Sequence, residues 1–361
     1  MNQFSTTDLQ YIQEQFHLEL EQAYKGHKTS FAFIKNQIPH TSLVQTGETF
    51  QILVVGGSVF KSALVKKDQN NRFILLKRSE KPQPAFRSEN SFLSFILSEV
   101  DDSVSKIALN FAYPIEPVFR ETYLDGKLIY GTKENTFEGM QEKLIGQTIE
   151  RYLRSKKAKT VLVSVANDTV CLVLSGLTEF SSHQIAGGIV GTGMNFAIML
   201  PDNSVINLEA AGFDKFEQTE SGKYIDERSV APGVAILEKE TSGAYLYQHF
   251  NYYAKKLGLD TPEISSTMQL DELSQSYNPD IAHLANSVLM RSASLVACVI
   301  GGITLFQKSD MVFIMEGSLF WMANRYKDHI KETLAKLVPH YSITFGRVED
   351  SPIFGAAKLL G

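Results

Sequence analysis

The order of β-prone and helical segments is the feature that most constrains how this chain of 361 residues folds. Three short β-prone runs begin near residue 50, followed by a helix, a strand, a second helix and another strand. A glycine turn and a polar turn separate the first three runs, which predicts an antiparallel meander. The predicted strands are 50–57, 61–65, 72–78, 106–114 and 160–168, and the predicted helices are 89–100 and 138–153.

A similar order of segments begins again near residue 185, and the sequence becomes mostly helical after about Val230. A duplicated architecture and a length beyond what one hydrophobic core usually organises predict two α/β domains with a cleft between them. An amphipathic helix is expected before the first domain, with Leu9, Ile12, Phe16 and Leu20 on one face. Later strands are predicted at 185–193, 195–200, 204–210 and 310–318, and later helices at 249–259, 285–303 and 321–337.

Composition excludes several classes of protein. Apolar residues make up 43% and charged residues 21% of the chain, which is typical of a globular protein. A net charge of −5 without a basic block argues against a nucleic-acid surface. No run of eighteen apolar residues and no secretory signal is evident, so we expect a cytoplasmic protein without a membrane partner. Cys171 and Cys298 lie far apart in apolar contexts, which favours buried thiols over zinc ligands.

Asn167, Asp168 and Thr169 stand at the end of a predicted apolar strand. A carboxylate at the C-terminal end of a strand projects toward an interdomain cleft, so Asp168 is a candidate general base. Phosphoryl transfer needs an acceptor for the proton of the attacking alcohol, with donors and a metal around the phosphates. The same three residues equally suit an ordinary Asx turn.

Small residues mark candidate sites for phosphate or for a flat ring. Glycine turns at 56–58 and 191–193 place backbone N–H groups where an anion can approach, although neither matches a Walker loop or a dinucleotide-binding loop. Gly317 and Ser318 end an apolar strand, and Gly355 lies in the last helix, where a flat ring could approach the backbone. Each position also suits a simple hairpin or close helix packing.

Three charged side chains are further candidates for substrate contacts. Lys133, which follows Thr132 in a loop, is placed to reach a sugar hydroxyl or a phosphate. Glu209 and Glu238 stand in apolar or glycine-containing surroundings, and such carboxylates suit the recognition of vicinal hydroxyls. Taken singly, each of these residues also suits a structural or solubilising role.

Taken together and in order, these segments resemble the eukaryotic-type hexokinase and glucokinase family of the actin-like ATPase superfamily. The resemblance covers nearly the whole chain, and the joint order is more specific than any one motif. The matching segments are Thr132-Lys133, Asn167-Asp168-Thr169, IVGTGMN at 189–195, NLEAAGF at 207–213, ILEKETSGAYLYQ at 236–248, RSASLVACVIGGI at 291–303, MEGSLF at 315–320 and EDSPIFGAA at 349–357.

The resemblance implies an α/β fold of two actin-like, ribonuclease H-like domains, each with a mixed five-stranded sheet flanked by helices. The small domain would comprise 46–168 plus about 350–361, and the large domain 1–45 plus 169–349. The implied activity is transfer of the γ-phosphate of ATP, in the presence of Mg²⁺, to the 6-hydroxyl of a hexose such as glucose. We expect a monomer or homodimer.

The resemblance also implies the roles of the site residues. Asp168 would accept the proton of the sugar 6-hydroxyl, with Lys133 as the second catalytic residue. Mg²⁺ would have no direct protein ligand and would reach Asp168 only through water. The implied hexose-binding residues are Pro114, Thr132, Lys133, Asn167, Asp168, Asn195, Glu209 and Glu238. The implied nucleotide-binding residues are Gly56, Gly57, Ser58, Lys61, Gly191, Thr192, Gly193, Gly317, Ser318 and Gly355.

The first phosphate turn departs from the family pattern. The family has Asp-x-Gly-Gly-Thr-Asn where this chain has VVGGSV at 54–59, so Val54 replaces the metal-associated aspartate and supplies no oxygen for Mg²⁺. Ala-Tyr-Pro at 112–114 replaces Ser-Phe-Pro, and Ala210 replaces a tryptophan, which predicts a hexose preference different from glucose. Two alternatives stay open: a weak or inactive hexokinase-like protein that binds sugar or nucleotide and regulates a partner, and an actin-like or chaperone-type ATPase without a sugar substrate.

Overall fold

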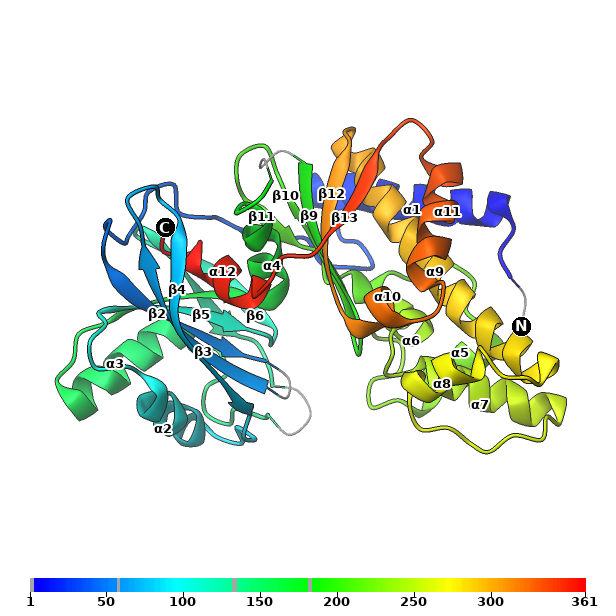
Figure 1. The fold of residues 1–361 in the computed structure, drawn as a ribbon, viewed down its shortest axis with the longest axis horizontal. Coiled ribbons are helices and arrows are strands. Elements are labelled where there is room, and N and C mark those ends of the chain that lie inside the picture. Colours follow the sequence, from blue (N-terminus) through cyan, green and yellow to red (C-terminus); the bar gives the residue numbers. More distant parts are fainter. Residues whose placement is uncertain (1–2, 57–58, 132–134, 181–183) are drawn as a thin grey trace. The chain divides into compact units, whose positions relative to one another are not determined.

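The computed structural model describes residues 3–56, 59–131, 135–180 and 184–361 (Figure 1). Internal contacts divide the chain into two compact units. Unit 1 comprises Met1–Phe33, Gly188–Phe196 and Leu208–Gly346, and unit 2 comprises Ile34–Gly187, Ala197–Asn207 and Arg347–Gly361. The domain limits expected from the resemblance stay a prediction.

Unit 2 contains a five-stranded sheet with the order β4-β3-β2-β5-β8. β3 pairs antiparallel with both β2 and β4, which confirms the predicted meander. β5 pairs parallel with both β2 and β8, so the sheet is mixed. The strands are β2 (Thr49–Val55), β3 (Val59–Lys67), β4 (Phe73–Pro82), β5 (Lys106–Phe111) and β8 (Leu162–Asn167).

Aromatic rings fill much of the core of unit 2. Phe86, Phe92 and Phe137 are buried together, and each pair of these rings has centroids less than 6 Å apart, at 5.3 Å, 5.5 Å and 5.7 Å. Their packing joins α2 to the turns that precede α3. The remaining elements around the sheet are α2 (Glu89–Glu99), α3 (Ile145–Lys157), α4 (Asp168–Gly176), α12 (Ser351–Ala357) and the hairpin of β6 (Ile115–Arg120) and β7 (Tyr123–Leu128).

A second, six-stranded sheet has the order β1-β11-β10-β9-β12-β13. β11 pairs antiparallel with β1 and β10, whereas β12 and β13 are parallel. The fold class is thus confirmed, with one strand more in this sheet than expected because the short β1 joins its edge. The strands are β1 (Ile34–Asn36), β9 (Ile185–Val190), β10 (Met194–Met199), β11 (Val205–Asn207), β12 (Met311–Glu316) and β13 (Ile343–Gly346).

Apart from β12, β13 and parts of β9 and β10, unit 1 is mostly helical. α9 packs against both α1 and α11 (Figure 1). This helix is long and apolar enough to cross a membrane, and 89% of its most apolar window is buried inside the structure. Neighbouring helices therefore cover its apolar faces. The helices are α1 (Thr6–Tyr24), α5 (Glu220–Arg228), α6 (Ile236–Thr241), α7 (Leu246–Leu257), α8 (Thr267–Leu273), α9 (Pro279–Gln307), α10 (Ser318–Met322) and α11 (Tyr326–Leu337).

Left-handed backbone explains three element boundaries that were predicted wrongly. Turns replace the start of the helix predicted at 138–153, because Gly139 (φ 88°) and Glu142 (φ 63°) cannot continue a right-handed helix. β11 stops before Glu209 (φ 45°), where a short 3₁₀ helix follows. Arg325 (φ 55°) interrupts the helix predicted at 321–337, so α11 begins only at Tyr326.

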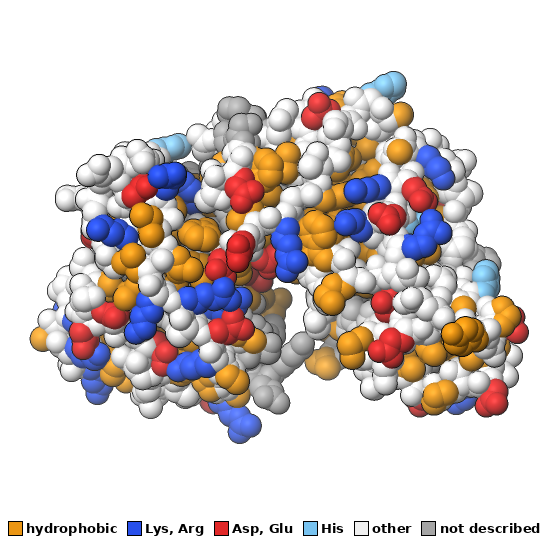
Figure 2. Space-filling model, in the orientation of Figure 1, with side chains coloured by type: hydrophobic (Ala, Val, Ile, Leu, Met, Phe, Trp, Pro, Cys, Tyr) orange, Lys and Arg blue, Asp and Glu red, His pale blue; other side chains and the backbone are white. Residues whose placement is uncertain are grey.

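The prediction of buried thiols agrees with the structure. Cys171 and Cys298 are free and buried, and burial raises the pKa of the Cys298 thiol, which disfavours a reactive thiolate. On the face displayed in Figure 2, basic and acidic side chains are interspersed rather than gathered into a basic block.

Candidate functional site

Asp168 is the first residue of α4, directly after β8. Asn167 caps this helix, and its side-chain oxygen accepts a hydrogen bond from the Thr169 N–H at 3.0 Å. One carboxylate oxygen of Asp168 accepts from the Thr169 N–H at 2.7 Å and from the Thr169 hydroxyl at 3.2 Å. The Asx turn predicted from the sequence is thus a helix start, where the helix dipole favours an ionised carboxylate. A half-buried carboxylate at a helix start suits a proton acceptor.

Two contacts within unit 2 fix the start of α4. Asn207 at the end of β11 places its amide nitrogen 3.4 Å from the side-chain oxygen of Asn167. Gly355 of α12 packs so closely on α4 that an added Cβ would lie 1.8 Å from the carbonyl oxygen of Cys171. The structure therefore supports the role of Gly355 in close helix packing, whereas its role in nucleotide binding stays a prediction.

The first glycine turn is held by side chains from elsewhere in unit 2. The carbonyl oxygen of Gly56 accepts hydrogen bonds from the Tyr113 hydroxyl at 3.0 Å and from the Gln83 amide at 2.7 Å. Burial raises the pKa of Tyr113 to about 12, so this hydroxyl keeps its proton and remains a donor. The tyrosine that departs from the family loop thus contacts the phosphate turn. The Ala-Tyr-Pro motif was visible in the sequence, but the contact between Tyr113 and Gly56 was not.

Other candidates of unit 2 have less direct support. Val54 is 7% exposed on β2, and no oxygen replaces the expected carboxylate at that position. The Lys61 ammonium lies 3.7 Å from the Glu80 carboxylate on the neighbouring β4, which gives it a partner other than phosphate. The Pro114 carbonyl accepts from the Ile129 N–H at 3.1 Å. Gly57, Ser58, Thr132 and Lys133 lie outside the described residues.

Unit 1 brings the three predicted sugar-side residues together. The side-chain oxygen of Asn195 accepts from the Ala210 N–H at 3.2 Å, which places Asn195 beside Glu209. A Glu238 carboxylate oxygen accepts from the Met194 N–H at 3.1 Å, next to Asn195. The Asn195 amide, the Glu238 carboxylate and the backbone that follows Glu209 thus meet at the start of β10, although they are far apart in sequence. An amide and a carboxylate placed together, with a second acid next to them in the chain, offer acceptors for sugar hydroxyls.

The second glycine turn of unit 1 is closely packed except at its tip. Gly191 lies against Gly317, where an added Cβ would be 3.1 Å from the Gly317 Cα. Gly317 needs its φ of 109° and would place a Cβ 2.1 Å from the Val190 carbonyl oxygen. Thr192 is exposed at the tip, and Ser318 begins α10 beside the turn. Backbone N–H groups and a hydroxyl around an exposed tip suit a polyphosphate.

The residues present fit a nucleotide better than a directly held metal. Among residues 3–56, 59–131, 135–180 and 184–361, no three His, Cys, Asp or Glu side chains are placed to hold a metal ion together. Mg²⁺ prefers oxygen ligands and keeps several waters when phosphates bind it. Val54 supplies no oxygen for Mg²⁺. Asp168 is therefore the candidate carboxylate that would contact Mg²⁺ through water.

Several known hexokinases are similar to this chain in sequence or in structure. A family model described as hexokinase matches residues 254–360. Hexokinase-9 of Oryza sativa subsp. japonica is 26% identical over 257 residues, covering 61% of this chain and 50% of the rice protein. The hexokinase of Kluyveromyces lactis is 24% identical over 382 residues, covering 86% and 77% of the two chains. The chain is hexokinase-like in sequence and in fold.

A solved structure supports the fold of this hexokinase-like chain over its whole length. The hexokinase from Schistosoma mansoni complexed with glucose matches with a TM-score of 0.81 and 19% identity, covering 99% of this chain and 95% of that one. The hexokinase-like chain spans only half the length of the rice relative. The resemblance predicted from the ordered motifs is therefore confirmed.

A buried polar cluster of the hexokinase-like chain lies behind the sugar-side acids and was not predicted from the sequence. His249 of α7 is 2% exposed, and its Nε2 lies 2.8 Å from the Lys239 carbonyl oxygen. A carbonyl only accepts, so Nε2 carries the hydrogen, and Nδ1 accepts from the Ser221 hydroxyl at 2.7 Å. Burial, opposed by the nearby Glu240 carboxylate and assisted by the Arg291 guanidinium, lowers the pKa of His249.

This cluster makes the stability of the hexokinase-like chain depend on pH. Because the folded pKa of His249 lies below its usual 6.5, the unfolded chain binds more protons between these two values. The contribution of His249 to the free energy of unfolding is therefore fully present above pH 6.5. It falls as the pH decreases below 6.5, by at most about 1.4 kcal/mol per pH unit for this one proton. We expect His249→Gln to flatten that part of the stability profile, measured by urea unfolding from pH 7.5 to 5. Parallel profiles for the two proteins would contradict the assignment.

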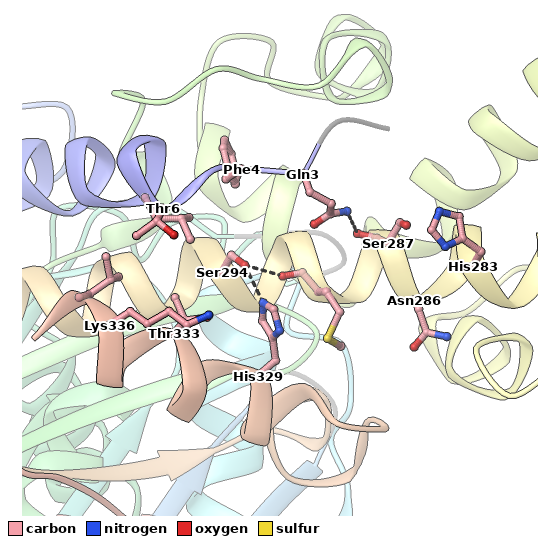
Figure 3. A pocket seen from close by; sticks show the side chains of 13 residues that line it. Gln3, Phe4, Thr6, His283, Asn286, Ser287, Ser294, His329, Thr333 and Lys336 are labelled. Carbon is pink, nitrogen blue, oxygen red and sulfur yellow. Dashed lines mark hydrogen bonds between the residues drawn. The ribbon is translucent and has the colours of Figure 1, made fainter. Parts of the chain in front are cut away.

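A cavity of about 400 Å³ between α9, α11 and the start of α1 contains a serine–histidine pair (Figure 3). The Ser294 hydroxyl lies 2.8 Å from His329 Nε2 and 2.9 Å from the Met290 carbonyl oxygen. Because its hydrogen goes to the carbonyl, the hydroxyl accepts from the imidazole N–H. An activated serine nucleophile needs the opposite direction of donation. This cavity therefore offers no support for hydrolytic chemistry.

Proposed function

We propose that this protein is an ATP-dependent hexose kinase that transfers the γ-phosphate of ATP to the 6-hydroxyl of a hexose. The observation that carries the proposal is that the Asn195 amide, the Glu238 carboxylate and the backbone beside Glu209 meet at the start of β10. An ATPase without a sugar substrate gives no reason for this cluster. The glucose bound by the Schistosoma hexokinase supports a hexose as the substrate.

In this proposal the sugar-side residues orient the hexose and Asp168 accepts its proton. The hydroxyls of the sugar would donate to Asn195, Glu209 and Glu238, with Asn167, Pro114, Thr132 and Lys133 as further contacts. The sugar O6 forms a bond to the γ-phosphorus, the bond between that phosphorus and the bridging oxygen of ADP breaks, and the O6 proton passes to the Asp168 carboxylate. Mg²⁺ supplied with ATP neutralises phosphate charge.

The nucleotide is proposed to lie against the second glycine turn. Gly191 and Gly317 keep side chains away from the backbone there, and Thr192 presents a hydroxyl at the tip. Gly56, whose carbonyl is held by Tyr113 and Gln83 within unit 2, is proposed as a further nucleotide contact. The transferred phosphoryl group carries most of its charge on its equatorial oxygens, so oriented donors at the second turn would stabilise the transition state.

A second candidate function rests on Val54. Because a buried valine stands where the family pattern has an aspartate, the chain would bind sugar or nucleotide but turn over weakly or not at all. It would then act as a hexokinase-like regulatory protein. The retained Asp168, with its fixed carboxylate, favours the kinase.

Val54→Asp is expected to raise hexose phosphorylation by about tenfold or more if the missing carboxylate limits metal positioning, equivalent to about 1.4 kcal/mol in the barrier. The reason is that a carboxylate offers Mg²⁺ an outer-shell oxygen that valine lacks. The measurement is kcat as a function of Mg²⁺ concentration, with Val54→Asn as the uncharged control. Equal rates for wild type and Val54→Asp would show that this carboxylate is not limiting.

The experiment that tests the proposed function combines turnover and binding. ADP formation is measured for purified protein with ATP, Mg²⁺ and, separately, glucose, mannose, fructose or an N-acetylated hexose. Thermal unfolding is followed with the same sugars without ATP. Sugar-dependent ADP formation supports the kinase. Sugar-induced stabilisation without ADP formation favours the regulatory protein, and sugar-independent ADP formation favours an ATPase.

A further inference from the structure

α6 carries two acids that point in different directions. Glu238 and Glu240 are two residues apart, so their side chains lie on nearly opposite sides of the helix. Glu238 is half-buried and accepts from the Met194 N–H at 3.1 Å. Glu240 is 2% exposed and accepts from the Thr219 N–H at 2.7 Å. One acid therefore faces the sugar-side cluster and the other faces the interior of unit 1.

Tertiary contacts must fix the position of α6, because a helix of six residues is not stable by itself. The buried Lys239 ammonium pairs with Asp226 and donates to the Ala231 carbonyl at 2.8 Å. His249 donates to the Lys239 carbonyl at 2.8 Å. At the end of the helix, the Ser292 hydroxyl donates to the Thr241 carbonyl at 2.8 Å. Three separate parts of unit 1 thus hold α6 by polar contacts.

Glu240 connects α6 to two further helices through a buried charge. Its carboxylate lies at the N-terminus of α5, where Thr219 is the capping residue. Gly222 of α5 leaves room for it, since an added Cβ would lie 1.9 Å from the carboxylate. The Arg291 guanidinium of α9 approaches Glu240 at 3.6 Å and donates to the Glu217 carbonyl at 2.6 Å. Two opposite buried charges hold α6 between α5 and α9.

The segment after α6 extends this connection to the second glycine turn. The Gly243 N–H donates to the Gly191 carbonyl at 2.7 Å, and the Ala244 N–H donates to the Thr192 carbonyl at 3.1 Å. A displacement of α6 would therefore move Glu238 and loosen the 191–193 turn together. Both belong to the proposed substrate site, whereas the contacts of Glu240 and His249 are with Thr219, Ser221 and the Lys239 carbonyl.

We propose that Glu240, together with Arg291 and His249, is a positioning unit that holds Glu238 in the geometry required to bind a hexose. The inference rests on the proposed function, because Glu238 is a sugar ligand only within it. A purely structural role predicts lost stability with unchanged affinity of the folded protein. A positioning role predicts weakened hexose affinity even in a variant whose stability is restored.

The test compares wild type with Glu240→Gln, with each of Glu240→Met and Arg291→Met, and with the Met/Met double variant. Isothermal titration gives the hexose Kd, using the tightest-binding sugar of glucose, mannose and fructose, and thermal unfolding gives Tm. Each single Met variant leaves one buried charge without its opposite charge, whereas the double variant removes both, so Tm should recover. Glu263→Gln, which neutralises an exposed acid of unit 1, is the control.

We expect Glu240→Gln and the double variant to raise the hexose Kd by about tenfold or more, with Glu263→Gln unchanged. Wild-type affinity in Glu240→Gln, or recovery of both Tm and affinity in the double variant, would overturn the positioning role and leave the kinase standing. If Glu240→Gln does not fold, the double variant decides. If wild type binds none of the three hexoses, the proposed function fails and this inference fails with it.

Discussion

Asp168→Asn should lower kcat for hexose phosphorylation by about 10²–10⁴-fold, the usual contribution of a positioned general base. The amide keeps the shape of the side chain and an acceptor oxygen for the Thr169 N–H, but it cannot take a proton. Hexose affinity should change by less than about tenfold, because a base acts mainly in the transition state. The measurements are steady-state kcat by ADP formation and Kd by isothermal titration.

The control for this substitution is Asp102→Asn, which neutralises an exposed carboxylate elsewhere in unit 2. It should leave both kcat and Kd as in wild type. Asp168→Asn also loses a favourable charge at the start of α4, which costs about 0.3–1 kcal/mol of stability. Turnover by Asp168→Asn within threefold of wild type, on a folded protein, would remove Asp168 from the role of base.

Gly355→Ala is expected to lower the free energy of unfolding by about 1–3 kcal/mol or more, because overpacking forces neighbouring groups apart. An added Cβ would lie 1.8 Å from the Cys171 carbonyl oxygen, so backbone rather than a flexible side chain must move. The series Ala, Ser and Val at this position should show increasing loss, measured by urea unfolding.

A functional consequence follows from the place of Cys171 in α4, the helix that begins with Asp168. The less disruptive Gly355→Ala variant should show a lower kcat at a temperature where it remains folded. A residue that only bounds a nucleotide pocket predicts a raised KM for ATP with unchanged stability. An unchanged unfolding free energy for Gly355→Ala would therefore contradict the packing role.

Much of the fold followed from local sequence signals. The turn chemistry between the first three strands predicted the meander, and it formed because hairpin connections depend on nearby residues. The helix at 138–153 was partly wrong because an amphipathic pattern continued through Gly139 and Glu142, whose left-handed backbone only the folded context imposes. β1 was not predicted, because a strand of three residues is too short to show a periodic pattern.

Some residues of the candidate site could likewise be predicted from local sequence, and others could not. Asp168, Glu209 and Glu238 stood in recognisable segments, so the sequence could single them out. Glu240, two residues beyond Glu238, gave no such signal, because its partners come from α5 and α9, which are distant in sequence. Local patterns predict which residues face a substrate, whereas the buried contacts that fix those residues depend on tertiary packing.

The most direct test of the central claim is phosphorus NMR of wild-type protein with ATP, Mg²⁺ and the hexose that stabilises it most. A hexose kinase should give a growing hexose 6-phosphate resonance that matches the loss of the γ-phosphate signal, with ADP as the other product. Formation of inorganic phosphate instead, or an ATP spectrum that stays unchanged while the sugar remains bound, would contradict a hexose kinase.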